Sequence, residues 1–209
     1  VKQSIHYWCP DTKEHKFLGQ NVTVAILDTG ISPHPDFKDR ILSFRDFSST
    51  TGSSEKVLFS FSHFSPLIDN SGHGTHVAGI LAGSGLLSSG TYAGIAPFCN
   101  LIIGKVLDQN GNGSIKNVIN GIQWIRDIYT QSHIRIINIS VGTRPDLSIH
   151  QKLLLLNAVE SLWDLGLVVV VSAGNYGPAP GSVTVPGSSP KVITVGVPDT
   201  FPLIHTQRH

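Results

Sequence analysis

Three polar residues of this sequence stand where apolar runs end or a helix begins, and their side chains could take part in one reaction. Asp28 follows the apolar run 22–27, His73 lies between two glycines, and Asn175 follows shortly after the run 167–171. A carboxylate can orient an imidazole, an imidazole can move a proton, and an amide N–H can stabilise a developing oxyanion. These residue types together indicate acid–base chemistry.

Each of these residues has a simpler interpretation when it is taken alone. Asp28 could form a turn or cap a helix, and Asn175 could merely tolerate left-handed backbone. Asp-Thr-Gly is also a signature of aspartic proteases, but those need a second such carboxylate and the triplet occurs once here. His73 and His76 could bind zinc, but no third ligand lies nearby in the sequence, so His76 is expected to pack or hydrogen-bond locally.

Hydrophobic periodicity indicates the elements that must position these residues. Apolar, β-branched runs predict strands buried on both faces of a parallel sheet, over residues 22–27, 101–106, 134–139, 167–171 and 192–197. Apolar residues at helical spacing predict helices over 75–82, 115–128 and 149–163, with Ser114 as an N-cap and Gly166 as a stop. Strands that alternate with helices predict an α/β fold with a doubly wound, mostly parallel sheet and helices on both faces.

A sheet of this kind places its ligand crevice at the carboxyl ends of its strands. Asp28 and Asn175 follow two such ends, and Ser140 follows a third. His73 stands at the start of a predicted helix. We therefore expect the carboxylate, the imidazole and the amide to converge on one rim of the sheet.

The composition argues against several other classes of protein. The chain has 209 residues, of which 40% are hydrophobic and 14% charged, so it can bury a core. A net charge of +1 gives no electrostatic reason to expect nucleic acid or an anionic membrane as a partner. No apolar run reaches the roughly 18 residues that span a bilayer. Cys9 and Cys99 are too few for a disulfide framework, and the sequence leaves their pairing open.

Asp28, His73 and Asn175 lie in three segments whose sequences are informative beyond these single residues: Val24–Ile31, Asn70–Gly79 and Val170–Asn175. In this order they resemble the Asp, His and oxyanion-Asn blocks of the subtilisin-like serine proteases, or subtilases (peptidase S8 family). The likeness extends over about residues 22–197, and the segments 90–97 and 193–198 look most like the bacterial intracellular branch. It implies that Asp28 orients the imidazole of His73, that His73 is general base and then general acid, and that Asn175 donates to the oxyanion.

The same resemblance implies a peptide-binding cleft and a peptide or protein substrate. The implied residues are Gly111, Gly113, Ser140, Val141 and Gly142, as two backbone edges that bind an extended peptide, and Ala173 and Gly174, as part of the pocket wall. No cofactor is required by it. Asp36 matches a position that binds structural calcium in some subtilases, although the partner loop 83–94 lacks the expected Asn and carboxylate pattern. The low cysteine count and the likeness to the intracellular branch favour the cytoplasm and leave secretion open.

The nucleophile of the family is missing from the sequence. Subtilases carry it in a Gly-Thr-Ser-x-[Ala/Ser]-x-Pro block after the oxyanion Asn, and no Gly-Thr-Ser occurs here. Ser182 and Ser188 follow glycines but precede no helical pattern, so neither is a credible substitute. Residues 1–199 are therefore expected to be the N-terminal part of a subtilase catalytic domain, C-terminally incomplete through truncation, a frameshift or gene fragmentation. Residues 200–209 form an unrelated-looking tail.

The resulting expectation is a serine endopeptidase by family that is nearly inactive as the chain stands. Two alternatives remain: a pseudoprotease that binds peptides without cleaving them, and a two-piece enzyme whose serine arrives on another polypeptide. The absent segment would supply a central helix and further strands. The chain alone is therefore expected to expose apolar sheet faces and to aggregate or fold only in part.

Overall fold

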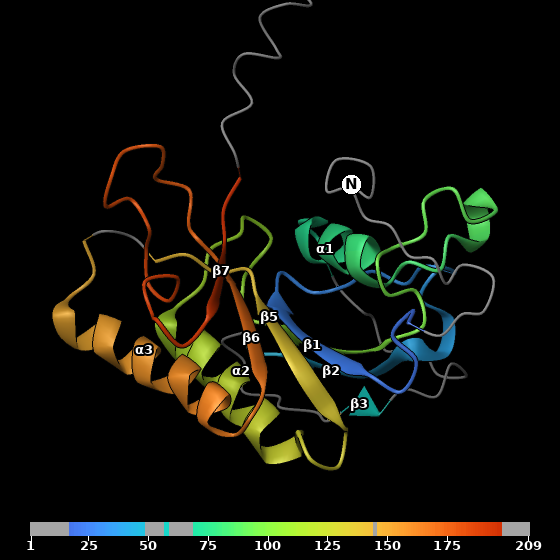
Figure 1. The fold of residues 1–209 in the computed structure, drawn as a ribbon, viewed down its shortest axis with the longest axis horizontal. Coiled ribbons are helices and arrows are strands. Elements are labelled where there is room, and N and C mark those ends of the chain that lie inside the picture. Colours follow the sequence, from blue (N-terminus) through green and yellow to red (C-terminus); the bar gives the residue numbers. More distant parts are fainter. Residues whose placement is uncertain (1–16, 49–56, 59–68, 144–145, 198–209) are drawn as a thin grey trace, which may run out of the picture.

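The strands of the protein form one sheet that carries helices on both faces (Figure 1). The structure, a computed structural model, describes residues 17–48, 57–58, 69–143 and 146–197. The strands are β1 (Thr23–Asp28), β2 (Ile41–Asp46), β3 (Val57–Leu58), β4 (Asn100–Lys105), β5 (Ile134–Ile139), β6 (Val168–Ser172) and β7 (Ile193–Val195). The helices are α1 (His73–Ala82), α2 (Ile115–Ile128) and α3 (Ile149–Asp164), with short 3₁₀ helices η1 (Lys38–Arg40) and η2 (Leu86–Ser88).

The strand order confirms the doubly wound α/β fold. Within the described residues the order is β3-β2-β4-β1-β5-β6-β7, and every pair is parallel except β2 with β3. From β1 the chain builds β2 and β4 on one side and then crosses to β5 on the other. The carboxyl end of β1 is therefore the switch point, where open α/β sheets place their ligand crevice.

Two hydrophobic cores hold the helices against the sheet. On one face α2 and α3 bury residues such as Ile122, Val159 and Ile137. On the other face Ala78 of α1 packs in a cluster that includes Ile26 of β1. Figure 1 shows α2 and α3 on one side of the sheet and α1 on the other. All six residues of β1 are buried, as its unbroken apolar run predicts.

Helices α2 and α3 begin where the sequence indicates, whereas α1 begins at His73, two residues before the predicted start. Helix α2 spans the predicted residues, and the Ser114 hydroxyl accepts a hydrogen bond from the Asn117 N–H at 3.1 Å. Helix α3 begins with a capping box between Ser148 and Gln151. Strand β2 was not predicted. A register shift between Ile41 and Ser43 breaks its alternation, so its buried residues do not appear at every second position.

The sheet face beside α1 is open over β6 and β7. Val168 of β6 is 39% exposed, and Ile193 and Val195 of β7 are 51% and 53% exposed. The prediction that this last strand is buried on both faces is therefore wrong, because no described element packs over it. A groove of about 290 Å³ runs here, lined by Val77, Ile80, Asn138, Ser140, Val170, Val171, Ser172 and Val195.

Two expectations fall outside the described residues. These are the tail 200–209 and the environment of Cys9. Cys99 is a free, buried thiol, and burial raises its pKa to about 11 although the nearby Arg40 charge opposes the shift. No helix in the described part of the chain is long and apolar enough to cross a membrane.

Candidate active site

A carboxylate and an imidazole meet at the carboxyl end of β1. Asp28 is the last residue of β1 and His73 the first residue of α1, and His73 Nδ1 lies 2.7 Å from Asp28 Oδ1. The Asp28 side chain is fully buried, whereas that of His73 is 54% exposed. An ionised carboxylate can only accept a hydrogen bond, so Nδ1 carries a proton, and in the neutral imidazole the lone pair is then on Nε2. The ring can therefore take a proton at Nε2 from a group in solvent or substrate.

The backbone around Asp28 is fixed by the neighbouring strand. The Asp28 carbonyl accepts the N–H groups of Val106 and Leu107 at 2.9 and 3.2 Å. The buried Lys105 ammonium donates to the carbonyls of Thr29 at 2.5 Å and Leu107 at 3.0 Å. The carboxylate also accepts the Thr29 N–H at Oδ1, while Oδ2 is buried with no hydrogen-bond partner in the described part of the chain. These contacts hold the acid in one orientation.

Helix α1 comes unusually close to the chain that follows β1. A Cβ on Gly74 would collide with the Gly30 carbonyl oxygen, at a distance that real Cβ atoms do not show. Gly30 and Gly72 both have positive φ angles, of 118° and 83°, which side-chain-bearing residues rarely adopt. The glycines on both sides of His73 thus let its backbone reach the strand that carries Asp28.

A second buried carboxylate, which the sequence analysis did not single out, lies beside this pair. Asp69 is 8% exposed and accepts hydrogen bonds from Thr29, Gly72 and Thr75. Burial by itself raises its pKa, but these hydrogen bonds outweigh that effect and hold the pKa below the ordinary value. The signal that could have found it is an acid directly before the Asn-Ser-Gly turn that leads into His73.

The predicted oxyanion donor lies on the same rim but does not contact the pair. Asn175 follows β6 and is exposed. Its strand is the second neighbour of β1, so the two strand ends are about 10 Å apart by ordinary strand spacing. Asn175 and Asp28 therefore stand at strand ends on either side of β5.

The predicted pocket wall is held by contacts between three loops. The Thr184 N–H donates to the Ala173 carbonyl at 3.0 Å, and a Cβ on Gly174 would collide with the Thr184 hydroxyl. A Cβ on Gly142 would lie 3.3 Å from the Gly174 Cα. The Ser140 N–H donates to the Leu27 carbonyl at 3.3 Å, and Val141 is buried. The ends of β5 and β6 therefore lie side by side with little space for added side chains.

The second predicted peptide edge is an exposed turn that hydrogen bonds to Asp108 hold together. The Asp108 carboxylate accepts the N–H groups of Asn110 and Asn112 at 2.8 and 2.9 Å. Gly111 has a φ of 75°, and a Cβ on Gly113 would approach the Val106 carbonyl at 2.5 Å. The turn connects β4 to α2, on the other side of β1 from Asn175.

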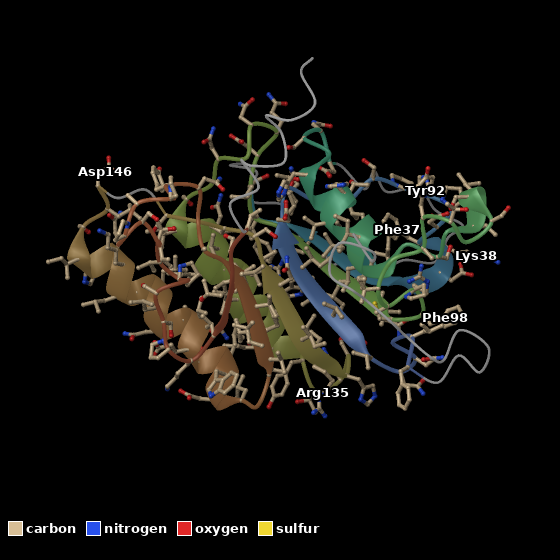
Figure 2. All side chains as sticks on the ribbon, turned by 45° about the horizontal axis from the view of Figure 1, so that its top comes forward. Phe37, Lys38, Tyr92, Phe98, Arg135 and Asp146 are labelled. Carbon is tan, nitrogen blue, oxygen red and sulfur yellow. The ribbon has the colours of Figure 1, made fainter. Side chains whose placement is uncertain are left out.

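The surroundings of Asp36 do not fit a calcium ion. Its carboxylate accepts the backbone N–H groups of Gly85 at 3.1 Å and Leu87 at 3.2 Å, and its carbonyl accepts from Arg40 and Ser84. Calcium takes six to eight oxygen ligands, whereas these neighbours are hydrogen-bond donors or cations. No group of three His, Cys, Asp or Glu residues within the described ranges could hold a metal. Figure 2 labels Phe37 and Tyr92, which line the hollow of about 770 Å³ at this end of the molecule.

The remaining candidates stay apart from the pair. His76 is exposed and lines the same hollow as Asp36. Ser182 and Ser188 lie in the irregular segment after Asn175, and neither hydroxyl hydrogen-bonds to His73 in the described contacts. The structure thus brings Asp28 and His73 together and gives neither serine the position of a nucleophile.

Comparison with known proteins identifies the architecture that carries this pair. The sequence pattern of the subtilase family matches residues 19–201. This chain belongs to the subtilase family. Serine protease AprX of Bacillus subtilis (strain 168) is 43% identical over 186 residues, which cover 87% of this chain and 39% of AprX. The major intracellular serine protease of the same organism is 37% identical over 161 residues, which cover 76% of this chain and 44% of that protein.

Solved structures agree with the family assignment. Sphericase superposes with a TM-score of 0.70 at 30% identity, and S41 psychrophilic protease with a TM-score of 0.68 at 32% identity. Each match covers 84% of this subtilase chain and 53% of the solved chain. The chain spans about two fifths of the length of the curated relatives named above.

Proposed function

We propose that this subtilase chain is the acid–base half of a serine endopeptidase, whose nucleophilic serine comes from outside these 209 residues. The observation that carries the proposal is the 2.7 Å contact between buried Asp28 and half-exposed His73. In that arrangement Asp28 keeps the proton on Nδ1 and stabilises the imidazolium. Nε2 takes the proton of a serine hydroxyl as it attacks a peptide carbonyl, then returns it to the leaving amine.

The substrate side of the proposal rests on the rim of the sheet. The edges at Ser140–Gly142 and Gly111–Gly113 would pair with an extended peptide through main-chain hydrogen bonds. Asn175 would donate its side-chain N–H to the oxyanion of the tetrahedral intermediate. The gap between the ends of β1 and β6 supports this assignment, because the scissile carbonyl must lie between base and donor.

The open sheet face supports an external source for the serine. The groove between α1 and β5–β7 includes Val77 of α1, one turn after His73, and Ser140 at the rim. A segment that packs there would cover Val170 and Val195 and would lie on the face of the sheet that carries α1, whose first residue is the exposed His73. The family relatives named above are about twice as long as the matched region, so they have enough further chain to supply such a segment.

The test joins residues 1–197 to the part of AprX that follows its matched region. The fusion should hydrolyse a chromogenic peptide amide, and the same segment added as a separate polypeptide should do so more slowly. A fusion that folds but cleaves no peptide would contradict the proposal. Peptide binding by the unfused chain together with an inactive fusion would instead indicate the binding-module alternative.

A further inference from the structure

The buried carboxylate of Asp69 has no part in the proton transfers described above. It is 8% exposed, and in the described contacts it has no cationic partner. Four hydrogen bonds compensate its burial. Oδ1 accepts the Thr29 hydroxyl at 2.8 Å and the Gly72 N–H at 2.9 Å, and Oδ2 accepts the Thr75 N–H at 2.8 Å and its hydroxyl at 2.6 Å.

The two hydroxyls that bind Asp69 also link β1 to α1. The Thr29 hydroxyl, next to Asp28, accepts the Gly74 N–H of α1 at 2.9 Å. The Thr75 hydroxyl of α1 accepts the N–H of Ser32, which follows β1, also at 2.9 Å. Each hydroxyl therefore donates to Asp69 and accepts from the other element. Gly72 and Gly74, the residues on both sides of His73, are both held by this network.

An acceptor-only group at this position fixes the direction of every hydrogen bond in the network. Because ionised Asp69 cannot donate, both hydroxyls must point their protons at it and turn their lone pairs toward backbone N–H groups. The carboxylate also lies at the N-terminus of α1, where negative charge is favoured. A neutral or absent side chain would free the hydroxyls to rotate.

We infer that Asp69 is a positioning residue that sets the distance between Asp28 and His73. The inference rests on the proposed function for its catalytic consequence, but its structural part stands on the network alone. Loss of the carboxylate would let the start of α1 shift against the end of β1. A shift of about 1 Å at a proton-transfer site can lower a rate about 100-fold.

The experiment compares Asp69→Ala, Asp69→Asn and the control Asp46→Ala, an acid that caps Ser48 at the end of β2. In the unfused chain, the NMR signal of the His73 Nδ1 proton reports the bond to Asp28. Asp69→Ala should abolish this signal, whereas Asp46→Ala should leave it in place. In the AprX fusion, Asp69→Ala should lower kcat by up to about 100-fold with KM within about twofold. Asp69→Asn keeps one acceptor oxygen but turns an N–H donor toward one of the two threonines, so it should recover only part of that loss.

Two results would overturn the inference. One is an Asp69→Ala variant that keeps both the Nδ1 proton signal and kcat. The other is an Asp46→Ala variant that loses them to the same extent. If Asp69→Ala does not fold, Thr75→Val removes one bridging hydroxyl with little change of shape and should weaken the same signal. A wild-type fusion without activity would contradict the proposed function alone, because the proton signal still tests the role of Asp69.

Discussion

At the scale of single residues, function depends on how polar side chains are held rather than on which residues are present. Asp28 is held by β4 and Thr29, and His73 by the two glycines beside it. The pair could be predicted from the sequence because each member ends or begins a regular element. Asp69 was missed because its place before the Asn-Ser-Gly turn marks it only as a turn residue, and it neither ends nor begins a strand or helix.

The oxyanion assignment predicts a loss confined to turnover. Asn175→Ala in the AprX fusion should lower kcat about 10²- to 10³-fold with little change in KM, because the donor acts on charge that develops in the transition state. Steady-state kinetics on a peptide amide measures this. Gln123→Ala, on the exposed face of α2, is the control. An unchanged kcat in Asn175→Ala would remove Asn175 from the site.

The lowered pKa of Asp69 predicts how stability depends on pH. A carboxylate whose folded pKa lies below its unfolded value stabilises the fold above about pH 4 and loses that contribution as pH falls through the folded pKa. The difference in melting temperature between wild type and Asp69→Asn should thus be largest at neutral pH and should narrow below about pH 4. Thermal melts from pH 3 to 7 measure it, and a difference that stays constant over this range would contradict the assignment.

At the scale of elements, one close approach positions the site: that of α1 to the chain after β1. Periodicity predicts α2, α3 and the central strands well, because their buried faces repeat regularly. It misses β2, where a register shift interrupts the repeat. It also predicts that β7 is buried on both faces, whereas the residues of β7 are exposed. An apolar residue on a sheet face that no described element covers looks the same in the sequence as an apolar residue of the core.

Two glycines of α1 provide a matched test of this approach. Gly74→Ala places a methyl group against the Gly30 carbonyl and should cost about 1–3 kcal/mol of unfolding free energy. Gly79→Ala meets no atom within 4 Å and should stabilise the helix by about 0.5–1 kcal/mol. Urea denaturation measures both. Equal effects of the two substitutions would show that the close contact does not restrict α1.

The environment of Asp36 predicts that the loop after α1 does not need calcium. Two backbone N–H groups of this loop already donate to the Asp36 carboxylate, whose oxygens a cation would need as ligands. A chelator and excess calcium should therefore give the same melting temperature. Asp36→Ala should lower stability by about 1 kcal/mol, because two backbone N–H groups lose their acceptor. Differential scanning fluorimetry measures both, and a rise in melting temperature with calcium would contradict this interpretation.

At the scale of the whole molecule, the open face of β6 and β7 predicts self-association of the chain alone. Exposed apolar residues on an edge strand favour pairing between molecules. Light scattering should detect oligomers, and Ile193→Lys should reduce them. The control Leu87→Lys, on exposed η2 away from the sheet, should not. A monomeric wild-type chain with a sharp cooperative melt would contradict the prediction.

The central claim is that this chain contributes the acid–base pair to a serine from elsewhere. The most direct measurement is kcat/KM for a peptide amide with the AprX fusion and with the same fusion carrying His73→Ala. The account predicts measurable hydrolysis by the first and a loss of about 10⁴-fold or more in the second, because the triad acts as a unit. Equal activity in the two proteins would contradict it, since the proton would then be taken by a group other than His73.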